Sequence, residues 1–413
     1  MSAKLRLHAA PATFVSFAVI LAFSAAALVA LSSASTSRSR AAGARRRAPA
    51  ASPQPKCGDK ITADTTLHHD LIDCTNNGIV IGADGITLDL NGHTIDGDGK
   101  LLATCPRNKI CDVGVVSLGH DGVTVVGGSL GEFALGGLVG NASRPHLLGL
   151  SSSGNRFAGA EIFNSPRTLV RDSKFVGNGL HTDQAGLGLH DSPDGRFLRN
   201  SFGHNGDIGM FVDGSNRNRI EGNVFSRNPE AAILMEEGSG NEMRRNHLSR
   251  NGEGFTVAGN RNVIARNRVS DSRAPGVAGV GIFVAAGRDN VIARNVVGGS
   301  SKAGIVVGLF PRETGGHPSG VATVIRGNRL RRGNLDGLLV RKTALGTVLR
   351  RNRAHGSKDD GFDVESRTAT LAGNSAVGNA DLGIEAVRGV IDGGGNRASG
   401  NGDPRQCTNI ACR

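Results

Sequence analysis

The stretch from Gly209 to Glu236, GMFVDGSNRNRIEGNVFSRNPEAAILME, decides the fold of this chain. GMFVD and AILME are short apolar runs that each end on an acidic residue, and the second repeats the first; between them, apolar residues alternate with other residues in NRIEGNVF. Alternation with a period of two over four or five residues predicts β-strand rather than helix. The Gly and Asn residues between the runs are typical of tight turns. Each such unit is therefore predicted to hold two or three short strands.

The unit recurs along the chain from about Gly78 to Val387, and two series of residues mark it. The leading residues are Gly186, Gly209, Ala232, Gly254, Gly281, Gly304, Gly337, Gly361 and Gly383. The second series is Asn200, Asn223, Asn246, Asn267, Asn295, Asn328, Asn352, Asn374 and Asn396. Both series advance mostly by 22 to 24 residues, and two markers that move in step are a specific sign of a solenoid.

A single unit cannot bury its apolar face alone, whereas stacked units bury it continuously. Equivalent strands of successive coils would then pair in parallel, about 4.8 Å apart, and about thirteen coils would follow one another. Asn residues at the same bend of successive coils are expected to stack as a hydrogen-bonded ladder. The sequence predicts an all-β fold made of one parallel β-helix.

The N-terminal segment has the features of an export signal. Residues 1–34 combine a basic start, an apolar run and small residues at Ser32-Ser33-Ala34, which predicts a signal peptide cleaved near Ala34. An uncleaved membrane anchor is the alternative, because the run is near the lower length limit for spanning. Residues 35–56 are predicted to be a flexible linker, 57–406 the β-helix, and 407–413 a C-terminal cap. We expect a secreted or cell-surface protein without stable membrane insertion after cleavage.

The cysteines agree with export, because they are found only near the two ends of the predicted β-helix. Six cysteines allow fifteen pairings, and proximity in sequence favours joining neighbours. The chain has no Cys-x-x-Cys pair, which favours disulfides over zinc. The favoured pairs are Cys57–Cys74, Cys105–Cys111 and Cys407–Cys412.

The charge of the chain gives little support to a nucleic-acid partner. The formal net charge is +12, but residues 1–56 carry eight Lys and Arg and no acidic residue. The remainder has 40 basic and 36 acidic residues, with basic residues scattered along the repeats, and the chain has no Trp or Tyr on which bases could stack. We expect a monomer that binds no nucleic acid.

The strand register predicts which side chains point outward. Counting from the leading residue, the first and third positions should point inward, and the second and fourth outward. The fourth positions are Phe163, His190, Asp213, Glu236, Ala258, Ala285, Gly308, Arg341 and Glu365. His190, Asp213 and Glu236 thus fall on consecutive coils, and Glu161 faces outward on the coil before them.

His190, Asp213 and Glu236 are the first candidates for catalytic residues. Neighbouring carboxylates raise one another's pKa, and carboxylates about 5 Å apart suit a retaining glycosidase. Alternatively, Asp213 and Glu236 could bind Ca²⁺, or the whole group could be an ordinary solvated outer face. Substrate-binding candidates near this group are Glu161, together with His181 and Asp183 on a loop.

A second candidate group precedes and enters later strands. Asp336, Asp360 and Asp363 are second choices for catalysis, and Asp336 is expected to lie beneath Asp360 on the adjacent coil. Arg341 and Lys342 are candidates for binding an anionic substrate. Asp before Gly is also a common turn pair, so a purely structural role is the alternative.

The repeat resembles the right-handed parallel β-helix superfamily of pectate lyases, polygalacturonases, alginate epimerases and NosD-type periplasmic proteins. The resemblance covers about residues 57–406, and NGIVIGADGITLDLNGHTIDGDG at residues 77–99 is similar to the first coil of NosD-like members. It implies a right-handed solenoid. The motif DDG at residues 359–361 resembles the paired aspartates of polygalacturonases, but the Gly-His-Gly of that family is absent from the next coil.

Three functions remain open from the sequence. The resemblance favours a protein that acts on or binds a polysaccharide, with an acidic one preferred because neutral sugars are usually held by Trp and Tyr, which the chain lacks. A lyase, a hydrolase and an epimerase are all compatible with it. The alternatives are a non-catalytic extracellular scaffold and, third, a NosD-like role in metal-centre maturation.

Overall fold

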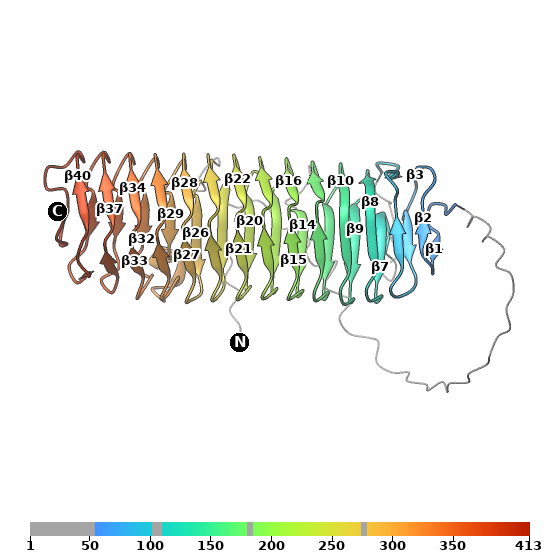
Figure 1. The fold of residues 1–413 in the computed structure, drawn as a ribbon, viewed down its shortest axis with the longest axis horizontal. Coiled ribbons are helices and arrows are strands. Elements are labelled where there is room, and N and C mark those ends of the chain that lie inside the picture. The colour runs from blue at the N-terminus through green and yellow to red at the C-terminus, as the bar shows by residue number, and fades with distance from the viewer. Residues whose placement is uncertain (1–53, 101–109, 180–184, 274–278) are drawn as a thin grey trace, which may run out of the picture. The chain divides into compact units, whose positions relative to one another are not determined.

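The structure, a computed structural model, describes residues 54–100, 110–179, 185–273 and 279–413. The predicted signal segment and nearly all of the predicted linker lie outside these residues, as do His181, Asp183 and Cys105. Residues from Pro53 onward form one compact unit. That unit is a parallel β-helix in which each regular coil contributes one strand to sheet A and two to sheet B (Figure 1).

Sheet A has 14 strands, all parallel, in the order of the sequence. Its strands are β1 (Lys60–Ile61), β4 (Ile79–Ile81), β7 (Val113–Leu118), β9 (Leu135–Gly140), β11 (Ala158–Phe163), β14 (Ala185–His190), β17 (Ile208–Asp213), β20 (Ala231–Glu236), β23 (Glu253–Ala258), β26 (Ile282–Ala286), β29 (Ile305–Val307), β32 (Leu338–Val340), β35 (Phe362–Val364) and β38 (Ile384–Ala386).

Sheet B runs around the rest of each coil in two rows that meet at a bend. The first row holds β2 (Thr65–Thr66), β5 (Thr87–Asp89), β12 (Leu169–Arg171), β15 (Arg196–Leu198), β18 (Arg219–Glu221), β21 (Glu242–Arg244), β24 (Val263–Ala265), β27 (Val291–Ala293), β30 (Val324–Arg326), β33 (Val348–Arg350), β36 (Thr370–Ala372) and β39 (Ile391–Asp392).

The second row holds β3 (Leu71–Cys74), β6 (Thr94–Gly97), β13 (Lys174–Val176), β16 (Ser201–Gly203), β19 (Val224–Ser226), β22 (His247–Ser249), β25 (Arg268–Ser270), β28 (Val296–Gly298), β31 (Arg329–Arg331), β34 (Arg353–His355), β37 (Ser375–Val377) and β40 (Arg397–Ser399). Two longer strands, β8 (Thr124–Gly131) and β10 (His146–Ser153), span both rows.

The predicted all-β solenoid is confirmed, with one coil more than the sequence suggested. Helix α1 (Pro311–Thr314) is a single short turn in a loop between coils. Within the described residues, no helix has both the length and the apolar character needed to cross a membrane.

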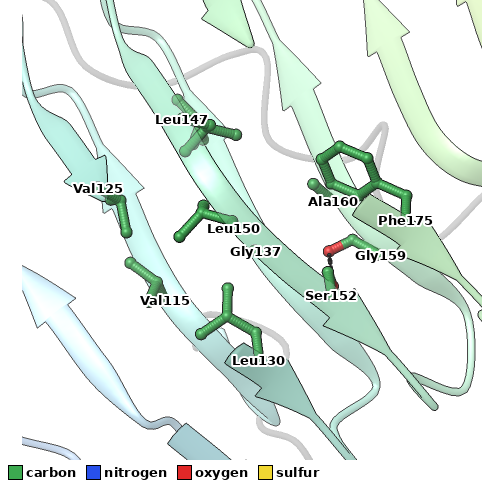
Figure 2. A pocket seen from close by; sticks show the side chains of 11 residues that line it. Val115, Val125, Leu130, Gly137, Leu147, Leu150, Ser152, Gly159, Ala160 and Phe175 are labelled. Atoms are coloured by element: carbon green, nitrogen blue, oxygen red, sulfur yellow. Dashed lines mark hydrogen bonds between the residues drawn. The ribbon is translucent and has the colours of Figure 1, made fainter. Parts of the chain in front are cut away.

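The interior follows the predicted alternation of side chains. On β17, Met210 and Val212 are fully buried, whereas Phe211 between them is partly exposed. Inside sheet B, Phe202 lies between Phe175 and Phe225, with ring centroids 5.3 and 4.7 Å away. The interior of the early coils contains a small hollow, which is lined mainly by aliphatic side chains and by one polar side chain, Ser152 (Figure 2). Because this hollow is inside the coil, it is part of the core and no ligand site.

The predicted asparagine ladder is present at the bend between the two rows of sheet B. Asn223 Nδ2 donates to Asn246 Oδ1 at 3.1 Å, and the same bond links Asn328 to Asn352 at 2.9 Å. Each backbone N–H of the ladder also donates to the next amide oxygen, as Asn223 does at 2.9 Å. These bonds satisfy polar groups that the bend buries, and they fix the bend in every coil.

Two disulfides lie near the ends of the solenoid, Cys57–Cys74 and Cys407–Cys412, as proximity in sequence suggested. The predicted Cys105–Cys111 pair falls partly outside the described residues. The C-terminal tail packs on the last coil, because the backbone of Cys407 forms an isolated parallel β-bridge with Ile384, and that of Cys412 forms one with Asn396. Disulfides of this kind are typical of extracellular or periplasmic compartments.

One predicted outward position is wrong. Ala258 pairs with Ala286 and not with Ala285, because the register shifts between Val257 and Ala258. Ala285 is fully buried as a result. The extra residue in GIFVAAG is accommodated as a bulge, which a fixed count from Gly281 cannot detect.

Candidate functional site on the outer face of sheet A

The outer face of sheet A carries the predicted polar residues in register. His190 on β14 is the direct partner of Asp213 on β17, and Asp213 is the partner of Glu236 on β20. Adjacent strands lie about 4.8 Å apart, so these three side chains start from neighbouring points on the same face. With Glu161 on β11 they form what we call the histidine cluster.

His190 lies between two carboxylates. Its Nε2 donates to Glu161 Oε2 at 3.1 Å, and its Nδ1 lies 3.8 Å from Asp213 Oδ2. Burial alone would lower the pKa of His190, but the carboxylates of Asp213 and Glu161 outweigh burial and raise this pKa to about 10. The imidazole is therefore a cation at neutral pH, and it can donate protons but cannot act as a general base there.

A glycine makes the Glu161–His190 pair possible. Gly188 is the partner of Glu161 on the next strand, and a Cβ at Gly188 would lie 2.1 Å from Glu161 Oε2. The Glu161 carboxylate thus occupies the space over Gly188, and the side chain is only 10% exposed. Gly188 occupies an outward position, where the other strands of this face mostly carry a side chain.

Asp213 and Glu236 have unlike surroundings. The Asp213 side chain is 44% exposed and has the His190 cation beside it. The pKa of Glu236 is raised, first by burial and then by the negative charges of Asp213, Glu230 and Glu237. Two neighbouring carboxyl groups with different environments, one of them with a raised pKa, are the kind of pair that acid–base catalysis uses.

An apolar patch adjoins this pair. The Phe211 ring meets the His190 ring edge to face, with centroids 5.6 Å apart. Leu234, Ile208, Ala231 and Ala185 pack together with Phe211 on the same face. The cluster therefore combines ionisable groups with an apolar surface over adjacent coils.

The second predicted group also comes together, further along the same face. Asp336, Asp359 and Asp360 have carboxylate oxygens within 4.8 Å of one another, and they are the group of metal-ligating type that stands out among the described residues. Asp360 N donates to Asp336 Oδ1 at 3.3 Å, as expected for residues stacked on adjacent coils. Asp363 and its strand partner Glu385 complete what we call the carboxylate cluster.

Burial and mutual repulsion raise the pKa values of three carboxyl groups in the carboxylate cluster. Burial and Asp359 raise the pKa of Asp336 to about 6, and burial and Asp336 raise that of Asp363 to about 7. The pKa of Asp360 rises to about 8, first through burial and, among the other causes, through its hydrogen bond with Glu385. At neutral pH the cluster therefore shares protons among its carboxyl groups.

The predicted basic residues have different environments. The Arg341 guanidinium lies 3.3 Å from the centroid of the Phe310 ring, and burial lowers the pKa of Arg341. Lys342 is exposed beside it. Arg341 is thus held by an aromatic ring near the carboxylate cluster, whereas Lys342 is presented to solvent.

Sequence analysis missed Glu253 on β23. Burial first, and then Glu230, raise the pKa of Glu253 to about 7, although a hydrogen bond from Thr256 opposes this shift. Glu253 directly precedes the leading Gly254, as Asp336 and Asp360 precede theirs. The residue before the leading glycine also points outward. If that column had been compared from coil to coil, Glu253 would have been found in the same position as Asp336 and Asp360.

The candidates on the loops are not placed. His181 and Asp183 lie outside the described residues, so their relation to the histidine cluster stays a prediction.

The fold is a parallel β-helix, with two groups of carboxylic acids on the outer face of one sheet. A family model described as periplasmic copper-binding protein (NosD) matches residues 144–308. A search of curated proteins finds no significant relative.

Solved structures with a similar fold include PfbA, a surface adhesin of Streptococcus pneumoniae, at 11% identity, with 74% of this chain and 82% of that chain covered and a TM-score of 0.47. The Azotobacter vinelandii mannuronan C-5 epimerase AlgE6 A-module is 15% identical, with 76% and 87% covered and a TM-score of 0.48. An alginate lyase from a Paenibacillus species is 13% identical, with 71% and 91% covered and a TM-score of 0.37.

The described residues within the matched segment offer no assembled copper site. Met210, Met235 and Met243 are fully buried inside the coils. The histidines His146, His190, His204 and His247 stand in different columns of the solenoid. Copper sites combine imidazole with sulfur ligands at one point, and the three methionines point into the core here.

Proposed function

We propose that this protein is an exported glycan-directed protein that cleaves a polysaccharide at the histidine cluster. The observation that carries the proposal is the register pair Asp213–Glu236, in which the His190 cation lies beside Asp213 while burial and the negative charge of Asp213 raise the pKa of Glu236. Side chains that start from adjacent strands about 4.8 Å apart can bring two carboxyl groups to the separation of about 5 Å that retaining glycoside hydrolysis uses.

The residues would act in two steps. Glu236 would donate its proton to the glycosidic oxygen while the Asp213 carboxylate attacks the anomeric carbon and the leaving sugar departs. Glu236, now ionised, would then take a proton from water as that water hydrolyses the Asp213 ester, which restores both groups. His190 would not touch the reacting atoms. It would act as a positioning residue that places a positive charge beside the Asp213 carboxylate.

The substrate class follows from the composition and charge of the exposed face. The chain has no Trp or Tyr to stack on neutral sugars, and Arg341 and Lys342 lie on this side of the later coils. We therefore favour an acidic polysaccharide, in which basic side chains bind the carboxylates. Ca²⁺ at Asp213 and Glu236 remains an alternative, although the His190 cation 3.8 Å from Asp213 opposes it.

The test is an assay of purified protein on polyuronates and neutral glycans, with and without Ca²⁺. We expect new reducing ends without unsaturated uronates, and we expect Glu236→Gln and Asp213→Asn to lower the rate by about 10²–10⁴-fold. The exposed neighbour Glu237→Gln is the matched control, because it removes the same charge one residue away and is the smallest of the charges that raise the pKa of Glu236, so it should lower the rate far less.

Other outcomes would contradict the assignment. Full activity in Asp213→Asn would move the site away from the histidine cluster. Unsaturated products would indicate a lyase instead of a hydrolase. Binding of a glycan without turnover by the wild-type protein would favour the non-catalytic scaffold.

A further inference from the structure

A strongly basic surface lies on sheet B, where two coils follow one another with arginines in the same columns. Residues 324–334 and 348–358 contain seven arginines and one lysine, and no Asp or Glu. All seven arginines are exposed. We call this surface the arginine face, and it consists of Arg326, Arg329, Arg331, Arg332, Arg350, Arg351 and Arg353.

The register places like charges directly over one another. Arg326 on β30 is the partner of Arg350 on β33, and Arg329 on β31 is the partner of Arg353 on β34. Arg331 is the partner of His355. Like charges that face each other on adjacent strands destabilise a sheet, so this arrangement lowers the stability of the two coils unless an anion lies over them.

Earlier coils of the same solenoid pair arginines at their bends with acidic residues. Arg199 bonds Asp172 at 2.8 Å, Arg217 bonds Asp194 at 2.7 Å, and Arg245 bonds Glu221 at 2.6 Å. None of the ion pairs found among residues 54–100, 110–179, 185–273 and 279–413 includes an arginine of the arginine face. Because the compared coils share the same repeat and strand pairing, the contrast comes from their side chains and not from the backbone.

The fold does not require arginine at these positions. The column of Arg326 and Arg350 continues with Ala293 before them and Ala372 after them. The column of Arg329 and Arg353 continues with Val296 and Ser375. Neutral residues therefore occupy the same places in neighbouring coils with the same strand pairing.

The arginines stand on a rigid base. Asn328 and Asn352 lie at the bend between the two rows, and Asn328 Nδ2 donates to Asn352 Oδ1 at 2.9 Å beneath the arginine face. Guanidinium groups are thus presented on two coils at a strand spacing of about 4.8 Å. A planar guanidinium binds a carboxylate through two parallel hydrogen bonds. Once one carboxylate of a polymer is bound, its neighbours are held at a high effective concentration near the other arginines, so several contacts together raise the affinity.

We propose that the arginine face binds a linear polysaccharide bearing carboxylates, as a second glycan surface distinct from the outer face of sheet A. A nucleic acid fits less well, because the chain has no Trp or Tyr for stacking and carries disulfides typical of compartments outside the cytoplasm. The inference does not depend on catalysis at the histidine cluster, since binding and cleavage are measured separately.

The experiment compares two fourfold variants of the full chain that lose the same charge. One carries Arg329→Gln, Arg331→Gln, Arg350→Gln and Arg353→Gln, all on the arginine face. The control carries Arg199→Gln, Arg217→Gln, Arg244→Gln and Arg245→Gln, which are the arginines paired with acids. Binding of size-defined polygalacturonate is measured by calorimetry over a range of salt concentrations.

We expect the first variant to bind polygalacturonate at least about tenfold more weakly, with a shallower salt dependence, because fewer counterions are released. The control should stay within about twofold of wild type. The melting temperature of the first variant should be equal to or above that of wild type at low salt, since repulsion is relieved, which shows that weak binding does not arise from unfolding.

Two results would overturn the proposal. The first is equal binding of polygalacturonate by wild type and the arginine-face variant. The second is a preference of wild type for double-stranded DNA or for vesicles with anionic lipids over polygalacturonate, lost in the same variant, because it would assign the surface to another class of partner.

Discussion

The histidine cluster and the carboxylate cluster lie on the same outer face of sheet A, yet they manage negative charge in opposite ways. In the first, the His190 cation lies between Glu161 and Asp213. In the second, Asp336, Asp360 and Asp363 have raised pKa values and share protons. The comparison teaches that carboxylates aligned by the same strand register differ in their electrostatic environment according to whether a histidine lies among them.

The largest effect is expected from removing the cation. His190→Ala leaves Glu161 and Asp213 next to each other without a counter-charge, with Glu161 only 10% exposed. Removing one partner of a buried charge pair commonly costs several kcal/mol, and we expect about 3 kcal/mol here because the pair is not fully buried. Urea unfolding at pH 7 measures it. A loss below about 0.5 kcal/mol would show that the pair contributes as little as an exposed one.

Gly188→Ala tests the geometry of the same cluster without removing a charge. The new Cβ would displace the Glu161 carboxylate, so the contact with His190 should weaken and the pKa of His190 should fall. We expect a loss of about 1–2 kcal/mol, typical of overpacking.

Gly195→Ala does not serve as control, because its Cβ would also clash. Gly149→Ala, with open space around its Cβ but a positive φ, shows the backbone cost alone. Equal losses in Gly188→Ala and Gly149→Ala would remove the support for the close approach.

The carboxylate cluster should respond with the opposite sign. Asp363→Asn removes a group whose pKa is raised to about 7, and therefore removes repulsion once the cluster ionises. We expect the variant to be more stable than wild type by about 1 kcal/mol at pH 8, and no more stable near pH 4, where the group is already protonated. Thermal unfolding at both pH values measures the difference. A variant that is less stable at pH 8 would show that Asp363 makes a favourable contact there.

The two clusters also predict different pH windows. Raised pKa values of Asp336, Asp363 and Asp360 mean that their contribution to stability is full below the ordinary Asp pKa and is lost as pH rises through about 6, 7 and 8. His190 contributes fully below its ordinary pKa, and its contribution is lost as pH rises through about 10. Stability should therefore fall in two stages, and Asp360→Asn should flatten only the first, as a melting-temperature profile from pH 4 to 10 would show.

Much of this architecture could be predicted from the sequence, because the repeat fixes the register. Alternation around each leading glycine was enough to place His190, Asp213 and Glu236 in one column. The bulge at Ala258 was not predictable, because a fixed count cannot show where an extra residue is absorbed.

Contacts between columns were equally hidden. The Glu161 carboxylate can lie over the neighbouring coil only because Gly188 there has no side chain. In the sequence, the arginines of residues 326–353 look like scattered charges. Only the pairing of β30 with β33 and of β31 with β34 shows that they lie in the same columns.

The most direct test of the account is the protonation state of His190. Carbon-labelled histidine observed by NMR over pH 5 to 10, with the His190 signal assigned by its loss in His190→Gln, reports this state. The account predicts that His190 stays protonated through pH 8 and titrates near 10. Titration near the ordinary histidine value of about 6.5 would contradict it, because Asp213 would then have no cation beside it at neutral pH and the division of roles between Asp213 and Glu236 would lose its basis.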